Sequence, residues 1–513
     1  MTTIDTAAGA DADAVDPIEA LLADYPVSRR LPERDLEVGE MRLAARITRR
    51  WGEDLRYVHG LGGWHRWDGD HLVLCERAEQ LEAAKRIIDD MREDAIAYRA
   101  EAKRAEEQGR PDDGAAVYAR LLGVDIGRLS SARSLTGGLT LASSSPELAL
   151  SHRDVDTDPW ELNTPSGLVD LRTGAVTPRV QGTLTPHTKV TRGRPGRGGW
   201  QGGEWDRFLQ QVIDSPQERA FLQRSFGLSL VGQVIDQHLL ILTGAGANGK
   251  GVLRTAIMHA LGDYSTEVSP DLLLRSGQGR HGTFLMRLHG ARTVFTSETD
   301  VAAEIDAAAM KRLTGGDPLE ANFMRCDPIC WDPTHSLIMA TNYLPNVGAA
   351  DPAVWRRMHV VQFRHVFSEG DPVRPIDPGL AERLRGCADE VLAWLLDGLA
   401  DYLRRGHLDP PASVRASIDE YRAESDIWQL FVDDQVDVDD DAEGERTSSA
   451  DLHRAYVWWL QQRGVRGSDL PSLTAWGRDM AKRSEWAGRR GRDRTGSFFA
   501  RVRVRSAGGV RVG

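Results

Sequence analysis

Cysteine is scarce in this sequence, and long uninterrupted apolar stretches are missing from it. The four cysteines, Cys75, Cys326, Cys330 and Cys387, are too few and too scattered for a disulfide framework. Cys326 and Cys330 invite a zinc interpretation, but the second Cys/His pair that a tetrahedral site needs is absent nearby, so we expect buried thiols instead. No stretch approaches the roughly 18 apolar residues of a membrane span.

The start of the sequence also lacks the basic and apolar blocks of a signal peptide. Its first residues, MTTIDTAAGADADAVDPIEA, are acidic. We therefore expect a cytoplasmic protein without a membrane partner. Residues 1–30 are small, acidic and without periodicity, which predicts a disordered tail.

Net positive charge is lacking too, because the formal net charge is −12. This charge is unevenly distributed along the chain. Residues 433–445, DDQVDVDDDAEGE, carry eight acids and no base, a pattern typical of a solvated linker or tail. From Arg463 to the end, thirteen Arg and Lys residues stand against four acids. The sequence thus predicts a basic module at the end of an otherwise acidic chain. The local electrostatic field of such a module matters more for binding than the net charge of the whole chain.

Length and periodicity predict several domains in the 513 residues. Residues 31–191 form the predicted α+β amino-terminal accessory domain, with a hairpin in GGWHRWDGDHLVLC, long exposed helices over 76–120 and short strands in LNTPSGLVDLRTGAVTP. RGRPGRGGWQGG is the predicted linker. Strands and helices then alternate over 204–368, which predicts an α/β domain with a mostly parallel sheet, followed by a helical extension over 369–425.

The stretch ILTGAGANGKGVL places a glycine-rich turn between a predicted buried strand and a predicted helix. Gly244, Gly246 and Gly249 let the backbone N–H groups face a phosphate, and the following helix adds its positive end. Lys250 would reach the β- and γ-phosphates of ATP. The predicted nucleotide-binding residues are Gly244, Ala245, Gly246, Ala247, Asn248, Gly249, Lys250, Gly251 and Val252.

The Ser or Thr that usually follows the lysine and ligates Mg²⁺ is missing, because Gly251 stands in its place. Phosphate oxygens, waters and acids from elsewhere must then hold the metal, with Thr255 as a candidate to help through a water. The strand-like run ARTVFTSETD ends in Glu298 and Asp300. Glu298 is the candidate for activating water, and both acids are candidates for holding Mg²⁺.

Two further segments supply polar groups that phosphoryl transfer needs. The apolar run HSLIMATN ends in Asn342, which would hold the water or the γ-phosphate at the carboxyl ends of the strands. In the run WRR, Arg356 or Arg357 would act as a finger on a neighbouring subunit's γ-phosphate. Taken alone, the arginine pair is equally compatible with a surface salt bridge.

The order and spacing of these motifs resemble the superfamily 3 helicase core of phage and plasmid primase–helicases, relatives of the poxvirus-type replicative helicase. The resemblance runs through GAGANGKGVL, RTVFTSETD, KRLTGGDPLEANFMRCD, PTHSLIMATNYLP and DPAVWRRMHVVQF, over about residues 205–368. LNTPSGLVDLRTG also looks like the domain that commonly precedes this core.

The resemblance implies an AAA+ type P-loop ATPase that works as a ring, usually hexameric, and moves along single-stranded DNA. It also implies a hairpin facing the central pore, in which Arg325 grips the DNA backbone, while Lys311 approaches the nucleotide. A motor of this kind must hold phosphates rather than read bases.

The basic end of the chain predicts a winged-helix domain over 446–513. A helix over 448–464, a second over 473–484 and a basic hairpin over 494–506 follow the order of that module. An arginine-rich solvated tail is the alternative. The predicted DNA contacts are Arg478, Lys482 and Arg483 on the second helix and Arg489, Arg490, Arg492 and Arg494 on the wing approach.

The sequence therefore predicts a multidomain α/β protein that acts as an ATP-dependent DNA helicase in phage, prophage or plasmid replication. Its expected partners are single-stranded and forked DNA, its own copies, and a polymerase, primase and loader that the sequence does not identify. One alternative is an ATP-dependent origin-binding initiator that does not unwind DNA. A second is a P-loop phosphotransferase. Primer synthesis is not predicted, because no segment carries the acid and histidine pattern of a primase site.

Overall fold

The structure is a computed structural model. It describes residues 35–505 apart from 36, 111, 181, 197–198, 276–281, 297–303, 324–325, 348–351, 443, 468–469, 482, 484–485 and 487. The chain divides into two compact units. Unit 1 comprises Met1–Thr157, Val180–Thr188 and Arg325–Asp327, and unit 2 comprises the remainder.

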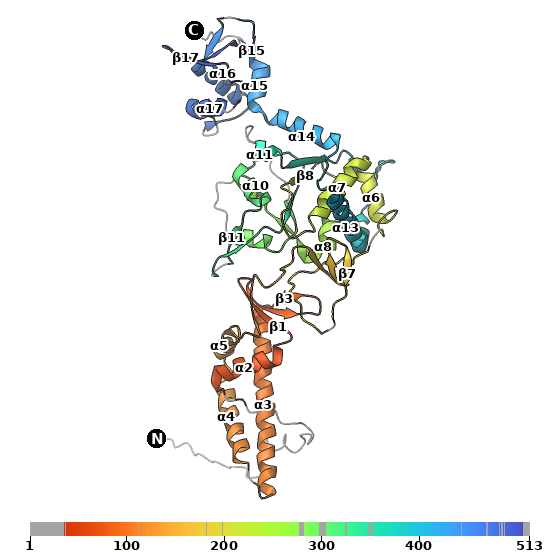
Figure 1. The fold of residues 1–513 in the computed structure, drawn as a ribbon, viewed down its shortest axis with the longest axis vertical. Helices are drawn as coiled ribbons and strands as arrows, with labels where there is room; N and C mark the ends of the chain where they lie inside the picture. The colour runs from red at the N-terminus through yellow and green to blue at the C-terminus, as the bar shows by residue number, and fades with distance from the viewer. Residues whose placement is uncertain are drawn as a thin grey trace, which may run out of the picture. The chain divides into compact units, whose positions relative to one another are not determined.

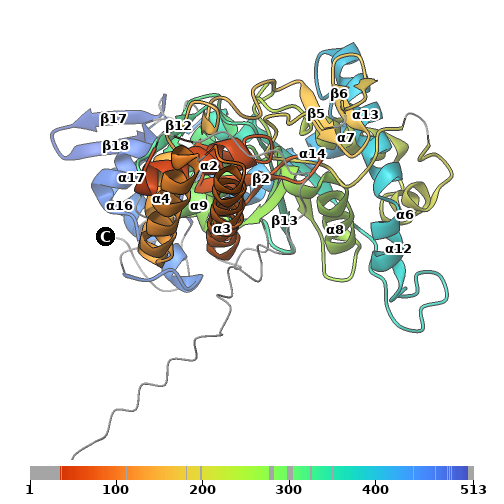
Figure 2. The same cartoon turned by 90° about the horizontal axis from the view of Figure 1, so that it is seen from below.

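Unit 1 combines a small sheet with long helices, as the sequence predicts (Figure 1). The sheet order is β3-β2-β1-β4, and β2 and β3 form the predicted antiparallel hairpin. The two longest helices of unit 1, α3 and α4, lie side by side (Figures 1 and 2). The described elements are α2 (Gly39–Trp51), β1 (Leu55–His59), β2 (Gly63–Trp67), β3 (Leu72–Leu74), α3 (Arg77–Glu107), α4 (Asp113–Leu129), α5 (Ala132–Ala142) and β4 (Ala149–Ser151).

A buried ion network lies inside unit 1, where the sequence predicts only exposed helices. Arg42 forms an ion pair with Asp35, with Nε 2.7 Å from Oδ1, and Arg42 Nη1 donates to Asp125 Oδ2 at 2.5 Å. Arg46 bridges Asp35 and Asp94, each at 2.6 Å. All five side chains are at most 9% exposed. Buried charges are tolerated only when they are paired in this way, so the network fixes how α2, α3 and α4 pack.

The short strands predicted over 162–178 are confirmed as an antiparallel sheet in the order β5-β6-β7. They are β5 (Glu161–Thr164), β6 (Gly167–Asp170) and β7 (Ala175–Thr177). This sheet is grouped with unit 2, whereas the predicted domain of 31–191 joins it to the preceding helices. The reason is packing, because Leu162 and Val169 are buried in the same apolar cluster as the helices after residue 204.

A five-stranded sheet in the order β14-β8-β13-β10-β9 forms the centre of unit 2. Every adjacent pair in it is parallel, which confirms the predicted α/β architecture. Apolar residues run without alternation through its central strands because helices cover such sheets on both faces. The strands are β8 (Leu239–Thr243), β9 (Ser265–Val268), β10 (Thr293–Thr296), β13 (Ser336–Thr341) and β14 (Met358–Gln362).

Helices and one small hairpin surround this sheet (Figure 1). Ser215 caps α7 by accepting a hydrogen bond from the Glu218 backbone, and Gly406 ends α13 in a left-handed conformation. The helices are α6 (Glu204–Val212), α7 (Pro216–Leu228), α8 (Lys250–Leu261), α9 (Gly282–Leu285), α10 (Ala307–Thr314), α11 (Pro352–Trp355), α12 (Leu380–Gly386), α13 (Ala388–Arg405) and α14 (Ala412–Ser425), and the hairpin is β11 (Leu319–Ala321) with β12 (Ile329–Trp331).

The end of the chain has an apolar cluster of its own, which begins at Trp428. We call residues 427–505 the C-terminal domain. The predicted start at 446 is therefore too late, because β15 pairs with β19, and the basic hairpin is β17–β18 rather than 494–506. The elements are α15 (Ile427–Gln435), β15 (Val436–Val438), β16 (Arg446–Ser448), α16 (Ser449–Gln462), α17 (Leu473–Met480), β17 (Arg490–Asp493), β18 (Gly496–Ala500) and β19 (Val502–Val504).

The cysteines are free thiols, but two of them differ from the prediction. Cys326 and Cys330 are exposed rather than buried, and Cys330 is the outward-facing residue of β12, between the buried Ile329 and Trp331. Within the described ranges, no group of three or more His, Cys, Asp or Glu side chains could hold a metal ion. None of the helices in the described part of the chain is both long and apolar enough to cross a membrane.

Candidate nucleotide site

The glycine-rich turn at 244–249 connects β8 to α8, as the sequence predicts. Gly244 and Gly249 adopt φ angles of +147° and +91°, which side-chain-bearing residues rarely adopt. A Cβ on Gly244 would lie 2.4 Å from the Phe363 carbonyl oxygen, and one on Gly249 would lie 2.5 Å from Val212 Cγ1. Glycine is therefore required at both positions for sterics as well as for backbone conformation.

Lys250 begins α8, and its ammonium group turns back over the loop. Its Nζ donates to the Gly244 carbonyl at 2.6 Å, to Asn248 Oδ1 at 3.1 Å and to Asn342 Oδ1 at 3.1 Å. The residue is 7% exposed. An ammonium group turned back over a glycine-rich loop is suited to attract an anionic ligand.

Asn342 reaches this lysine because of the order of the strands. It follows β13, which lies directly beside β8 and is parallel to it, so both strands end at the same edge of the sheet. The structure thus brings together Lys250 and Asn342, two residues that lie 92 positions apart in the chain. Ligands in open α/β sheets bind at this carboxyl edge.

Asn248 has a structural role that the motif does not reveal. Its Oδ1 accepts from the backbone N–H of Lys250 at 3.4 Å as well as from Nζ, and its Nδ2 donates to the Phe363 carbonyl at 3.5 Å. The Phe367 N–H donates to the Ala247 carbonyl at 2.7 Å. The loop is thereby fastened to the chain that leaves β14, a contact that only the tertiary structure creates.

The glycine-rich loop has backbone N–H groups and open space on one side. Within the described part of the chain, no acceptor takes the backbone N–H groups of Ala245, Gly246 and Ala247. A Cβ built on Gly246 or on Gly251 meets nothing within 4 Å, so this side of the loop is open. Val252, the last residue of the predicted set, is instead half-buried against the core.

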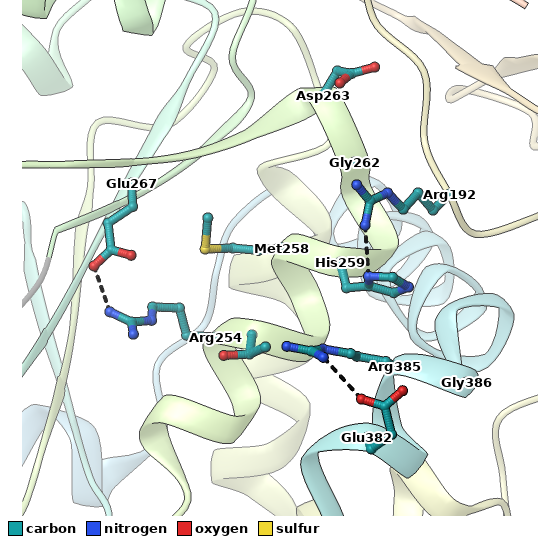
Figure 3. A pocket seen from close by; sticks show the side chains of 11 residues that line it. Arg192, Arg254, Met258, His259, Gly262, Asp263, Glu267, Glu382, Arg385 and Gly386 are labelled. Atoms are coloured by element: carbon teal, nitrogen blue, oxygen red, sulfur yellow. Dashed lines mark hydrogen bonds and ion pairs between the residues drawn. The ribbon is translucent and has the colours of Figure 1, made fainter.

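An open groove of about 720 Å³ runs along the outer face of α8 (Figure 3). Its charges are largely matched, since Arg254 pairs with Glu267 at 2.6 Å and Arg385 pairs with Glu382 at 3.0 Å. Thr255 lines this groove, and its hydroxyl donates to the Gly251 carbonyl at 2.9 Å. The hydroxyl is therefore directed at the helix backbone, which weakens the prediction that it assists metal binding.

The imidazole of His259, which also lines this groove, is favoured in its neutral form. Burial lowers the pKa of His259, and the nearby guanidinium groups of Arg192 and Arg385 lower it further. Arg192 Nη1 lies 3.0 Å from His259 Nδ1, which a neutral ring can offer as an acceptor (Figure 3).

The two candidate finger arginines are in different environments. Arg357 is 6% exposed, and its guanidinium donates to the Ala353 carbonyl at 2.7 Å and to Gln237 Oε1. Arg356 is exposed. Both precede β14, whose parallel pairing with β8 places them at the end of the sheet opposite Lys250. Among the described residues, none holds the Arg356 guanidinium in the way that Ala353 and Gln237 hold that of Arg357.

Several predicted residues lie outside the described residues, namely Glu298, Asp300, Arg325 and Lys482. β10 ends at Thr296, two positions before Glu298, and is parallel to β13. Lys311 lies half-buried on α10. The described neighbours of these residues thus agree with the predicted order of elements but do not test the roles.

The predicted DNA-contacting arginines separate into paired and exposed side chains. Arg483 forms two hydrogen bonds of 2.8 Å with the Asp426 carboxylate, so we remove it from the DNA contacts. Arg489 pairs with Asp440 at 2.7 Å. The exposed residues of the predicted set are Arg478, Arg490, Arg492 and Arg494.

Comparisons with known proteins agree with this organisation. Residues 44–214 match a family model described as "D5 N terminal like". A protein of Acanthamoeba polyphaga mimivirus named "Putative helicase L207/L206" is 28% identical over 270 residues. A Frog virus 3 protein named "Putative helicase 022R" is 26% identical over 277 residues. The chain is thus similar over part of its length to proteins of large DNA viruses that are named putative helicases.

The similarity to these viral proteins covers only part of each protein. The two matches span 50% and 51% of this chain but 28% of each relative. An African swine fever virus protein named "Putative primase C962R" is 23% identical over 171 residues, 32% of this chain and 18% of that protein. A solved structure, the NrS-1 C-terminal region, covers 57% of this chain and 64% of its own at 14% identity, and its TM-score of 0.36 is too low to carry an argument.

Proposed function

We propose that this protein is an ATP-dependent DNA helicase whose motor is an AAA+ type P-loop ATPase. The observation that carries the proposal is the hydrogen bond of 3.1 Å from Lys250 Nζ to Asn342 Oδ1 at the carboxyl edge of the parallel sheet. An additional strand, β13, lies between the loop strand β8 and β10. Because of this strand order, Asn342, which follows β13, would contact both the glycine-rich loop and the nucleotide that the loop would bind.

The roles of the site residues follow from their contacts. The backbone N–H groups of residues 245–247 and the N-terminus of α8 would bind the phosphates of ATP. Lys250 would exchange its loop carbonyls for phosphate oxygens, and Asn342 would hold the γ-phosphate or the attacking water. Mg²⁺ would neutralise the developing phosphate charge, held by phosphate oxygens, waters and the acids Glu298 and Asp300.

A second subunit is needed to complete this site. Arg356 precedes β14, whereas Lys250 follows β8, and the two parallel strands have five residues each. Such strands span about 17 Å. Arg356 therefore faces away from its own nucleotide and would serve a neighbour, which requires the head-to-tail contacts that close into a ring. A hexamer is the ring that the family resemblance implies.

Single-stranded DNA in the centre of the ring is the proposed substrate of the motor. The antiparallel hairpin β11–β12 follows α10, and the interval between its strands contains Arg325. A basic side chain there would hold phosphates without reading bases, as a translocating motor requires.

The test is ATP hydrolysis and strand displacement by the full chain. Purified protein is given ATP and Mg²⁺ with or without single-stranded DNA, and then a forked duplex, with Lys250→Ala as the control. We expect hydrolysis that single-stranded DNA stimulates and displacement that depends on it, both lost in the control. Hydrolysis without displacement would favour the origin-binding initiator, and hydrolysis indifferent to DNA would favour a phosphotransferase.

A further inference from the structure

Helix α4 of unit 1 carries apolar side chains on two sides. On one side, Tyr118 and Leu122 are buried in the apolar cluster of unit 1. On another side, Val117, Leu121 and Val124 are 48%, 44% and 46% exposed. A surface helix normally carries charged and polar residues on the side that faces away from the core. α4 therefore has an apolar face that unit 1 itself does not cover.

The three exposed side chains form one stripe along the helix. Val117, Leu121 and Val124 follow the spacing i, i+4 and i+7, which places them on the same face of α4. We call these three residues the α4 stripe. At 1.5 Å of rise per residue, the stripe is about 10 Å long. Single exposed apolar residues are common on protein surfaces, whereas contiguous ones are often binding sites, and this spacing suits a second helix that lies along the first.

Exposed arginines flank the α4 stripe. Arg120 lies one turn before Val124, and Arg128 lies one turn after it. Arg99 of the neighbouring helix α3 reaches the same region, because its Nη2 would lie 3.6 Å from a Cβ built on Gly123. Among the described residues, no acid forms an ion pair with any of these three arginines. The stripe is therefore bordered by positive charge that the described part of the chain does not neutralise.

The acids of α4 leave this positive border in place. Asp125 is buried, and its carboxylate is paired with Arg42 at 2.5 Å. Asp113 lies in the first turn of the helix, one turn before Val117. Neither carboxylate is placed between the arginines that flank the stripe. A ligand for this face therefore needs an apolar surface with negative charge beside it.

We propose that the α4 stripe is the docking site for an amphipathic helix of another protein, one that carries acidic residues beside its apolar face. Burial of the stripe would supply the affinity, and the carboxylates would pair with Arg99, Arg120 and Arg128. Nucleic acid fits less well, because its phosphates would match the arginines but leave the apolar side chains in water. Two copies of this chain that met through the same face would bring their arginines together.

This docking site goes beyond the proposed function and does not depend on it. The α4 stripe belongs to unit 1, whereas Lys250 and Asn342 of the nucleotide site belong to unit 2. A partner bound at the stripe would therefore be recognised whether or not the chain hydrolyses ATP.

The probes for the experiment are two synthetic peptides, each long enough for about three helical turns. Both carry leucines at the spacing i, i+3, i+4 and i+7. The acidic peptide has glutamates beside the leucines, and the basic peptide has lysines at the same positions. Fluorescence anisotropy of the labelled peptides measures their binding to the full chain. We expect the acidic peptide to bind at least about tenfold more tightly than the basic one, because like charges oppose docking.

Substitutions in the full chain locate the binding on α4. Leu121→Ser should weaken binding of the acidic peptide about tenfold or more, because a buried leucine contributes about that much. The matched control is Leu74→Ser on β3, where the leucine is 50% exposed, and it should leave the affinity unchanged. Arg120→Glu with Arg128→Glu should exchange the preference, so that the basic peptide binds more tightly than the acidic one. Binding of the basic peptide also shows that this variant is folded.

Three results would overturn the docking site. The first is equal binding of the two peptides by the wild type, or an equal loss in Leu121→Ser and Leu74→Ser. The second is a change in self-association of the chain in Leu121→Ser without peptide, measured by sedimentation, since the stripe would then join copies of this chain. The third is a labelled oligonucleotide that loses affinity in Arg120→Glu with Arg128→Glu while neither peptide binds the wild type, since the face would then bind phosphates.

Discussion

At the scale of single residues, the site depends on what each position can accommodate. Gly244 and Gly249 are fixed by close contacts, whereas a Cβ at Gly251 would meet no atom within 4 Å, and the backbone there is not left-handed. The missing hydroxyl after Lys250 is therefore not explained by lack of space. A serine there would have room and could offer its oxygen to a metal ion.

The first prediction follows from this open position. Gly251→Ser should fold normally and should bind Mg²⁺ with ATP as tightly as the wild type or more tightly. The measurement is the Mg²⁺ dependence of ATP hydrolysis, read as the half-saturating Mg²⁺ concentration. Gly249→Ser is the matched control and should lose activity, because its side chain would collide with Val212. A rise in the Mg²⁺ requirement of Gly251→Ser would contradict the prediction.

At the scale of elements, unit 1 depends on the buried network between α2, α3 and α4. Burial by itself would lower the pKa of Arg46, but the hydrogen bonds and charges of Asp94 and Asp35 outweigh it, and the pKa is raised. Arg46 also donates to the Tyr118 hydroxyl at 3.1 Å. The helices therefore share a charge network, so removing one partner leaves a buried charge unmatched.

The second prediction concerns this network. Asp94→Asn should destabilise unit 1 by about 3 kcal/mol or more, because breaking a buried pair leaves its partner uncompensated. Hydrogen exchange of the α2 and α3 amides measures this loss without requiring the whole chain to unfold at once. Glu82→Gln, which removes the exposed pair with Lys85, is the control and should change stability by less than about 0.5 kcal/mol.

The third prediction concerns pH and the central sheet. Burial lowers the pKa of His335, just before β13, to about 4, and it lowers that of His359, on β14, to about 4 with the help of nearby His238. The unfolded chain takes up these protons near pH 6.5, but the folded sheet does not. Stability from the two neutral rings is therefore complete above about pH 6.5 and is lost as the pH falls toward 4, by about 1.4 kcal/mol per pH unit for each histidine.

Calorimetric unfolding between pH 7.5 and 4.5 measures this effect. The variant His335→Gln, His359→Gln should show a flatter decline of stability with falling pH than the wild type, whatever its stability at pH 7.5. Equal slopes would mean that the two histidines take up protons over the same pH range in the folded and the unfolded protein.

At the scale of the whole molecule, Arg356 lies at the end of the sheet opposite the glycine-rich loop, so its proposed finger role requires a second subunit. The fourth prediction is complementation between two inactive proteins. Mixing Lys250→Ala with Arg356→Ala should restore part of the ATPase, because some interfaces then join an intact loop to an intact arginine. Arg357→Ala should fail to complement, since Arg357 holds Gln237 and Ala353 in its own subunit.

The size of the assembly provides the control for this mixing. Six copies of the 56.7 kDa chain amount to about 340 kDa, which analytical ultracentrifugation with nucleotide would detect. A protein that stays monomeric with full DNA-stimulated ATPase would contradict both the ring and the finger.

Features that depend on local chemistry could be predicted from the order of residues. The strand, glycine turn and helix around Lys250 could be predicted because they depend on apolar runs and on the backbone freedom of glycine, which involve only residues close together in the sequence. The parallel α/β core followed from the alternation of strand and helix patterns, the β2–β3 hairpin from its turn residues, and the long helices of unit 1 from their composition. Their order along the chain also carried the resemblance to the primase–helicases.

Contacts between distant residues, by contrast, depend on how the chain folds in space. The strand order places Asn342 next to Lys250. The fold also buries Arg357 while it leaves Arg356 exposed. The acidic segment of residues 433–445 was predicted as solvated because its charges repel one another, yet the arginines that neutralise it come up to 68 positions later. Pairing energies of this kind depend on distances in space, and a pattern of neighbours along the chain does not contain them.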